Sequence, residues 1–123
     1  FPSEILFDLG SDDLQEKGLF ELSQMAKVIR KIVKEIPKEI DWILRVDGHT
    51  DKTPFLNRGK FADNWELSQA RALSVVKYFI SEELLPAKRF AATGFGQFQP
   101  IDTGENEKAL ARNRRIEIKL TER

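Results

Sequence analysis

Residues 42–51 read WILRVDGHTD, and this stretch carries the first clear signal of the fold. Residues 42–46 are apolar except for Arg45 and are of the right length for a strand, and residues 47–51 follow as a polar turn. Residues 52–63 then form the longest irregular stretch of the chain. Long loops inside small domains tend to serve function, so we expect a site where this strand meets its loop.

Amphipathic helices are predicted on both sides of this stretch. Apolar residues recur at helical spacing over residues 14–36, and Pro37 ends that pattern because it cannot donate a backbone hydrogen bond. After the loop, Asp63 or Asn64 can cap a second helix that runs to about residue 82. Both helices carry an apolar stripe that needs a surface to pack against.

Further strands are predicted over residues 5–7, 90–95 and 115–120, with a short helix over residues 105–113. The expected order is therefore β-α-β-α-β-β. Two amphipathic helices need a sheet face for their apolar stripes. We predict an α/β (α+β) fold in one domain over residues 1–123, a two-layer sandwich with a mixed sheet of about four strands and helices on one face.

The composition excludes several classes of protein. Lys and Arg number 20 and Asp and Glu number 20, so the chain lacks the basic surplus that non-specific binding to nucleic acid or anionic lipid requires. No cysteine is present, which excludes disulfides and thiolate chemistry. No apolar run is long enough to span a membrane and no secretory signal is visible. Because the sequence begins with Phe1, we expect an anchoring segment upstream.

A candidate anion site lies at the start of the second helix. Asn64, Ser68 and Arg71 share one helix face, because they are spaced by four and three residues. A helix N-terminus with an arginine beside it suits a carboxylate or phosphate. The alternative is that Arg71 only packs its stem beside the core and Asn64 only caps the helix.

The single histidine suggests a second, weaker candidate. Asp47, His49 and Asp51 alternate, so His49 could ligate a metal or work with Ser68 or Ser74 in a catalytic triad. One histidine without cysteines makes a poor zinc site, and neither serine has a nucleophile-elbow sequence. We therefore expect a structural histidine that holds the turn, and no metal site or catalytic residue.

Two further motifs do not identify a function by themselves. Gly94-Phe95-Gly96 lacks the third glycine of a dinucleotide fingerprint, so these glycines are expected to supply positive φ at a turn. The segment from residue 108 to 123 holds six basic and two acidic residues. This surplus indicates either a solvated face or a cationic arm of an anion site; the lack of interleaved aromatic residues argues against RNA.

These signals occur together in one known order. VDGHTD (46–51), NWELSQARA (64–72), GFG (94–96) with Pro100, and NRRIEI (113–118) follow one another along the chain. With these motifs, the chain resembles the OmpA-like peptidoglycan-binding domain from about residue 5 to residue 120. DKTP (51–54) and NWELS (64–68) are most similar to the periplasmic domain of MotB-type flagellar stator proteins.

The resemblance implies a binding module without enzymatic activity or cofactor. Members of the family bind the peptide stem of peptidoglycan through its diaminopimelate residue and tether a membrane or motor protein to the cell wall. Matching motif to motif assigns the ligand-binding residues to Asp51, Arg71, Asn64, Thr50 and Arg114. The implied location is the periplasm of a Gram-negative-type bacterium. No nucleic acid and no direct membrane contact of this domain are expected, and homodimerisation stays open.

The ligand chemistry suits these assignments. Diaminopimelate offers an ammonium group beside a carboxylate, for which Asp51 supplies a fixed anion and Arg71 a bidentate cation. Arg114 is expected to add positive potential toward other stem carboxylates. Phe55 and Phe61 either pin the long loop or form a partner surface. Two rival functions remain: an interaction or dimerisation domain of OmpA-like fold without peptidoglycan affinity, and a hydrolase that uses His49 and Asp51.

Overall fold

The computed structural model describes residues 1–54 and 60–123, in which a mixed three-stranded sheet carries helices. The strand order is β2-β1-β3, with β1 parallel to β2 and antiparallel to β3. The elements in chain order are α1 (Ser3–Leu6), α2 (Glu16–Val33), β1 (Trp42–His49), α3 (Asn64–Ser81), the 3₁₀ turn η1 (Ala87–Arg89), β2 (Phe90–Gly94), α4 (Glu107–Asn113) and β3 (Arg115–Glu122).

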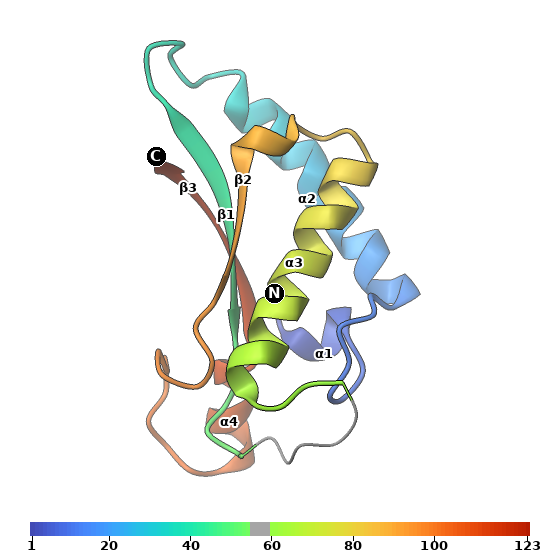
Figure 1. Ribbon diagram of the computed structural model, residues 1–123, viewed down its shortest axis with the longest axis vertical. Helices are drawn as coiled ribbons and strands as arrows, with labels where there is room; N and C mark the ends of the chain where they lie inside the picture. Colours follow the sequence, from blue (N-terminus) through green and yellow to red (C-terminus); the bar gives the residue numbers. More distant parts are fainter. Residues whose placement is uncertain (55–59) are drawn as a thin grey trace.

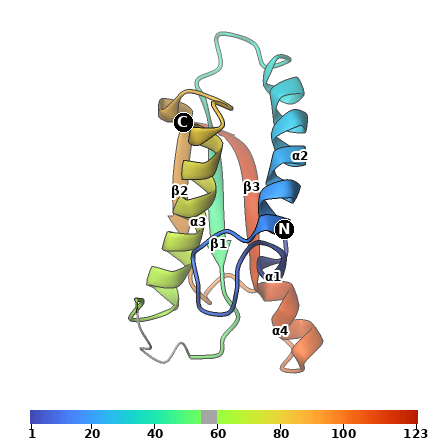
Figure 2. The same ribbon diagram turned by 90° about the vertical axis from the view of Figure 1, so that its right-hand side faces the viewer.

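The two long helices cover one face of the sheet, which confirms the predicted two-layer arrangement. Figure 1 shows the sheet nearly edge-on with α2 and α3 on one side, and both helices lie in front of the strands when the molecule is turned (Figure 2). The core between the layers is apolar and includes Leu22, Leu44, Val46, Val75 and Phe79, each at most 1% exposed. Burial of each such side chain stabilises the fold by about 1.5–3 kcal/mol. Among the described residues, no helix combines the length and the apolarity needed to span a bilayer.

The predicted strand over residues 5–7 is wrong. Residues 3–6 form the one-turn helix α1, and Phe7 makes only an isolated bridge with Leu14. Successive side chains of a strand point to opposite faces of a sheet, whereas Leu6 and Phe7 are both buried in the same core. The N-terminal segment instead contacts the sheet at Pro2, before α1, where Pro2 forms an isolated bridge with Arg115 of β3. The sheet of the described residues thus has three strands rather than about four.

Strand β1 is longer than predicted and includes residues assigned above to a turn. Asp47, Gly48 and His49 all pair with β3, and the chain leaves the sheet only at Thr50. Alternation places Leu44 and Val46 against the helices, and Asp47 and His49 on the opposite face. These residues stay in the strand because their backbone pairs with β3, and Arg45 of the same strand binds the carboxylate of Asp47.

Helix α3 packs close to the sheet because two glycines of the sheet have no side chain that would separate the helix from the strands. A Cβ atom on Gly48 would lie 2.2 Å from the carbonyl oxygen of Ser68, and one on Gly94 would lie 2.6 Å from the backbone nitrogen of Gln69. Gly96 has the predicted positive φ, of 60°, but Gly94 does not, and its role is this close approach. The contact brings the start of α3 beside the end of β1.

Candidate functional site

A cavity of 740 Å³ opens where β1 ends and α3 begins. These two element ends lie toward the lower end of the molecule in Figures 1 and 2. Helices α1 and α4 complete its wall. All five residues assigned from sequence motifs line it, namely Thr50, Asp51, Asn64, Arg71 and Arg114. The structure thus gathers into one cavity residues that lie up to 64 positions apart in the chain.

Asp51 holds its carboxylate in a fixed orientation at the cavity wall. Oδ1 accepts a hydrogen bond from the backbone N–H of Thr53 at 2.8 Å, and Oδ2 accepts one from Nη1 of Arg114 at 2.6 Å. The preceding residue is held as well, because the N–H of Thr50 donates to the carbonyl of Gly96 at 2.9 Å. Asp51 is only 8% exposed, so its charge acts in a poorly solvated place.

Arg71 places a buried cation on the same cavity. Its Nε and Nη2 donate to the carbonyls of Ser11 and Asp8 at 2.8 and 3.0 Å, and the guanidinium lies 5.0 Å from the ring centre of Phe7. Among the described residues no carboxylate lies within ion-pair distance of it, and Nη1 makes no hydrogen bond. Burial lowers the pKa of Arg71, although the group stays charged at neutral pH. The expected bidentate fork is therefore partly committed to backbone, and Nη1 together with the second N–H of Nη2 is left for a ligand.

Asn64 does not cap helix α3, which resolves the alternative left open by the sequence. The cap is Asp63, whose Oδ1 accepts from the N–H of Glu66 at 2.9 Å. Asn64 instead donates from Nδ2 to the carbonyl of Thr53 and to Oε1 of Gln97, each at 3.1 Å. It ties the chain beyond Asp51 to the start of the helix, and thereby supports the cavity wall.

Arg114 is bound by three carboxylates rather than free to meet ligand carboxylates. Its Nε, Nη1 and Nη2 donate to Glu4, Asp51 and Glu107 at 2.5, 2.6 and 2.5 Å. These hydrogen bonds raise the pKa of Arg114 although burial opposes them. Glu4 and Glu107 also line the cavity and were missed by the sequence reasoning. No spacing rule could have found them, because α1 and α4 lie at opposite ends of the chain.

Comparison with known proteins identifies the family. The model of the OmpA family matches residues 6–114. The chain belongs to the OmpA family. Motility protein B of Bacillus subtilis is 33% identical over 97% of this chain and 42% of its own length, and the Peptidoglycan-associated lipoprotein of Pseudomonas aeruginosa is 29% identical over 92% of this chain and 59% of its own. The OmpA-family domain thus spans less than half of that motility protein.

Solved structures give the same assignment. A MotB-like protein from Desulfovibrio vulgaris superposes with a TM-score of 0.85 at 30% identity, covering 99% of this chain and 70% of that one. The cell wall anchor of the T6SS from Pseudomonas aeruginosa gives a TM-score of 0.80 at 28% identity, covering 99% of this chain and 78% of that one. These likenesses confirm the OmpA-like fold and the resemblance to MotB-type domains.

The basic C-terminal segment of this OmpA-family domain is not an open cationic patch. Besides Arg114, its other paired cations are Arg112 with Asp102, Arg115 and Lys119 with Glu117, and Arg123 with Asp41. Asp102, Asp41 and the three acids around Arg114 lie near these cations, and all but Glu117 of the paired carboxylates come from outside the segment. Arg114 alone among these cations lines the cavity.

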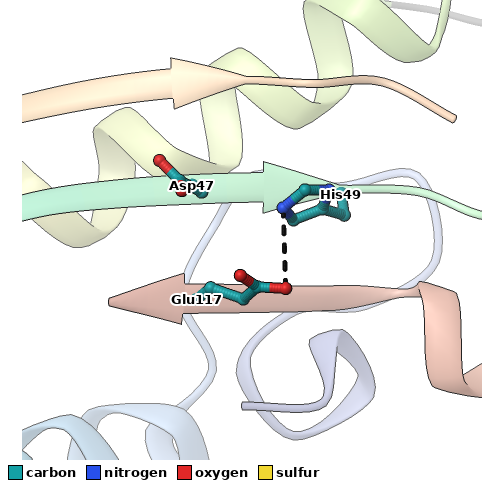
Figure 3. A group of neighbouring side chains, drawn as sticks. All are labelled: Asp47, His49 and Glu117. Carbon is teal, nitrogen blue, oxygen red and sulfur yellow. Dashed lines mark ion pairs between the residues drawn. The ribbon is translucent and has the colours of Figure 1, made fainter. Parts of the chain in front are cut away.

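A second polar cluster lies on the sheet face away from the long helices. Ligand atoms of Asp47, His49 and Glu117 lie within 4.8 Å of one another, and Nε2 of His49 is 3.8 Å from Oε2 of Glu117 (Figure 3). His49 stacks on Phe95 with ring centres 5.0 Å apart, and neither of its ring nitrogens has a hydrogen-bond partner among the described residues. Burial and the nearby Arg115 lower the pKa of His49.

The charges around this cluster support the structural interpretation of His49. Arg45 binds both oxygens of Asp47 at 2.8 and 3.0 Å, while Arg115 and Lys119 hold Glu117. A metal ion there would have to displace these cations from both carboxylates. The histidine lies in β1 rather than in a turn, on the face opposite to Ser68, whose hydroxyl accepts from the N–H of Gly96 at 3.0 Å.

The long loop is pinned in part. Phe61 is buried at 6% exposure, as one of the two predicted alternatives requires. Lys60 lies 5.7 Å from the centre of its ring, and its Nζ reaches Asp12 at 3.3 Å. Phe55 lies outside the described residues. Residues 60 and 61 are thus held in place by the ion pair with Asp12 and by the burial of the Phe61 ring.

Proposed function

We propose that this OmpA-family domain binds the peptide stem of peptidoglycan without cleaving it, and so anchors an envelope protein to the cell wall. Family membership and the names of its relatives support this proposal, since these include a peptidoglycan-associated lipoprotein and a cell wall anchor. The similarity to Motility protein B favours a stator-like role for the whole protein. We place the domain in the cell envelope, on the periplasmic side.

The observation that carries the proposal is one cavity with a fixed anion and a buried cation, which has no carboxylate within ion-pair distance among the described residues. Asp51 presents an oriented carboxylate, and Arg71 presents Nη1 without a carboxylate partner among the described residues. The free end of diaminopimelate carries an ammonium and a carboxylate on one carbon atom. We assign the ammonium to Asp51 and the carboxylate to Arg71, so that each charge of the ligand meets its opposite.

This assignment predicts selectivity between two stem peptides. A lysine-containing stem has the terminal ammonium but no carboxylate beside it. Arg71 would then lose hydration on binding without gaining a partner, which is the costly case for a buried charge. We expect binding about 10- to 100-fold weaker than for the diaminopimelate stem, or ~1.4–2.8 kcal/mol.

Calorimetric titration with both stem peptides tests the proposal. Selective binding of the diaminopimelate peptide, with the peptide recovered intact, is the expected result. No heat with either peptide would overturn it in favour of an interaction domain without peptidoglycan affinity. Cleavage of the peptide would instead favour the hydrolase that uses His49 and Asp51. Co-sedimentation with purified sacculi gives an independent measure of cell-wall binding.

A further inference from the structure

We infer that Glu4 and Glu107 are specificity-determining residues, which together with Asp51 form an acidic arm of the cavity that selects ligands carrying a free ammonium group. This inference rests on the proposed function and deepens it. The acidic arm is defined here as the carboxylates of Glu4, Asp51 and Glu107 around the guanidinium of Arg114. No sequence motif of the family assignment above includes Glu4 or Glu107.

The geometry of the acidic arm leaves it with excess negative charge. Arg114 gives one nitrogen to each carboxylate, at 2.5 Å to Glu4, 2.6 Å to Asp51 and 2.5 Å to Glu107. Three carboxylates against one guanidinium leave two negative charges uncompensated within the arm. The side chain of Asp51 is 10% exposed, whereas those of Glu4 and Glu107 are 52% and 77% exposed. The charge therefore extends from the cavity wall out toward solvent, where an approaching ligand meets it first.

The commitment of Arg114 to these acids changes its role at the site. Each of its three nitrogens already donates to a carboxylate, which leaves one N–H each on Nη1 and Nη2, and a ligand carboxylate that approaches them would meet three like charges. Arg114 is better described as a positioning residue that holds three negative groups together against their mutual repulsion. The expectation that it attracts further stem carboxylates is therefore replaced by an arm that attracts cations.

Two independent features of the cavity indicate a ligand opposite this arm. Arg71 is 7% exposed and lacks a carboxylate partner among the described residues, so the cavity has a positive side facing a negative one. Ser3, next to Glu4 and also in the cavity wall, is 3% exposed, and its hydroxyl has no hydrogen-bond partner within the described part of the chain. A ligand with both charges would satisfy the two sides at once.

The chemical class that fits is a zwitterionic amino-acid end with an unblocked ammonium group. Its carboxylate belongs on the Arg71 side and its ammonium inside the acidic arm. Blocking the ammonium by N-acetylation removes the positive charge while it keeps the carboxylate. The acidic arm should then contribute nothing, and the affinity of the blocked ligand should not depend on Glu107.

The test compares a diaminopimelate-containing stem peptide with its N-acetylated form in calorimetric titrations of three proteins: wild type, Glu107→Gln and Glu105→Gln. Glu105 is the matched control, because it is an exposed acid nearby that pairs with Lys52 and does not line the cavity. We expect Glu107→Gln to weaken binding of the free peptide about three-fold at low salt, an effect that shrinks as ionic strength rises. Binding of the acetylated peptide should stay unchanged.

The double variant Glu4→Gln/Glu107→Gln extends the series, with about ten-fold weaker binding of the free peptide expected. If Glu4→Gln disturbs α1, the comparison of Glu107→Gln with Glu105→Gln still tests the inference. The inference would be overturned if Glu107→Gln bound the free peptide as tightly as Glu105→Gln does, or if Glu107→Gln weakened the binding of both peptides equally. The proposed function would stand in either case. Failure of the wild type to bind either peptide would instead overturn the proposed function itself.

Discussion

The side chains of Asp51 and Arg114 meet at 2.6 Å across 63 positions of the sequence, and this contact orients the carboxylate that forms the negative side of the cavity. The positive side is built differently. Arg71 is held by backbone carbonyls and an aromatic ring, and is left without a carboxylate among the described residues. The carboxylate of Asp51 is thus paired within the protein, whereas Arg71 has no carboxylate within ion-pair distance among the described residues.

Replacing Asp51 by asparagine tests the negative side. Asparagine keeps an oxygen for the N–H of Thr53 but removes the charge, while Arg114 retains Glu4 and Glu107. We expect the diaminopimelate peptide to bind about 10- to 100-fold more weakly, with a modest fall in the melting temperature because the amide N–H of asparagine faces a donor, Nη1 of Arg114. Calorimetry and thermal unfolding measure the two effects. Unchanged affinity would exclude Asp51 as the ammonium partner.

Replacing Arg71 by alanine tests the positive side and has a structural cost as well. The carbonyls of Ser11 and Asp8 lose their donors, so the free energy of unfolding should fall by about 1–3 kcal/mol in addition to the loss of binding. Arg112→Ala is the matched control, because that arginine is 54% exposed and pairs with Asp102 outside the cavity. Urea unfolding should show that the free energy of unfolding of the control falls by less than about 1 kcal/mol. Equal losses in both variants would contradict the assignment.

Replacing Gly48 by alanine tests the close packing of α3 on the sheet. The new Cβ atom would lie 2.2 Å from the backbone of Ser68, so helix and strand must separate. We expect a destabilisation of about 3 kcal/mol or more, as for other overpacked sites. Thr93→Ala in β2, on the opposite face of the sheet, should cost far less. A Gly48→Ala protein as stable as wild type would contradict the packing.

Replacing His49 by phenylalanine tests the structural role of that residue. Both ring nitrogens lack partners among the described residues, and the ring stacks on Phe95, so an apolar ring of similar shape should pack at least as well. At neutral pH we expect the free energy of unfolding to rise by about 1 kcal/mol, because a buried unsatisfied group is removed. A marked loss of stability would indicate a polar role for the ring.

The pH dependence of stability gives a second readout at the same position. The pKa of His49 is lowered below its ordinary value of 6.5, because of burial first and the positive charge of Arg115 second; Lys119 adds to this, and Glu117 and Asp47 oppose it. The folded state therefore binds fewer protons than the unfolded state. This contribution is fully present above pH 6.5 and is lost as the pH falls below that value.

Unfolding by urea at about pH 7.5 and about pH 5.5 should thus show a less stable wild type at the lower pH. His49→Phe should reduce this difference. The two values of pH stay above the range near pH 4 where most carboxylates titrate, so their contribution is small. An equal pH dependence in both proteins would assign it to other groups.

Much of the fold follows from patterns that are local in sequence. Helices α2 and α3 lie where apolar spacing predicted them, and Asp63 caps α3 as one of the two predicted capping residues, since these signals depend only on residues a few positions apart. The wrong predictions concern segments whose structure depends on residues distant in the sequence. The one-turn helix before Phe7 and the extension of β1 through His49 depend on contacts with the core and with β3, which no local pattern contains.

The sequence by itself determined the family, the two-layer arrangement and five of the residues that line the cavity, because short motifs in a fixed order carry that information. Only the tertiary structure decided how those residues are paired. Arg114 is shared among Glu4, Asp51 and Glu107, and Arg71 is held by backbone, since guanidinium groups bind the nearest acceptors in space. Such neighbours come from α1, the end of β1 and α4, which meet only when the chain folds.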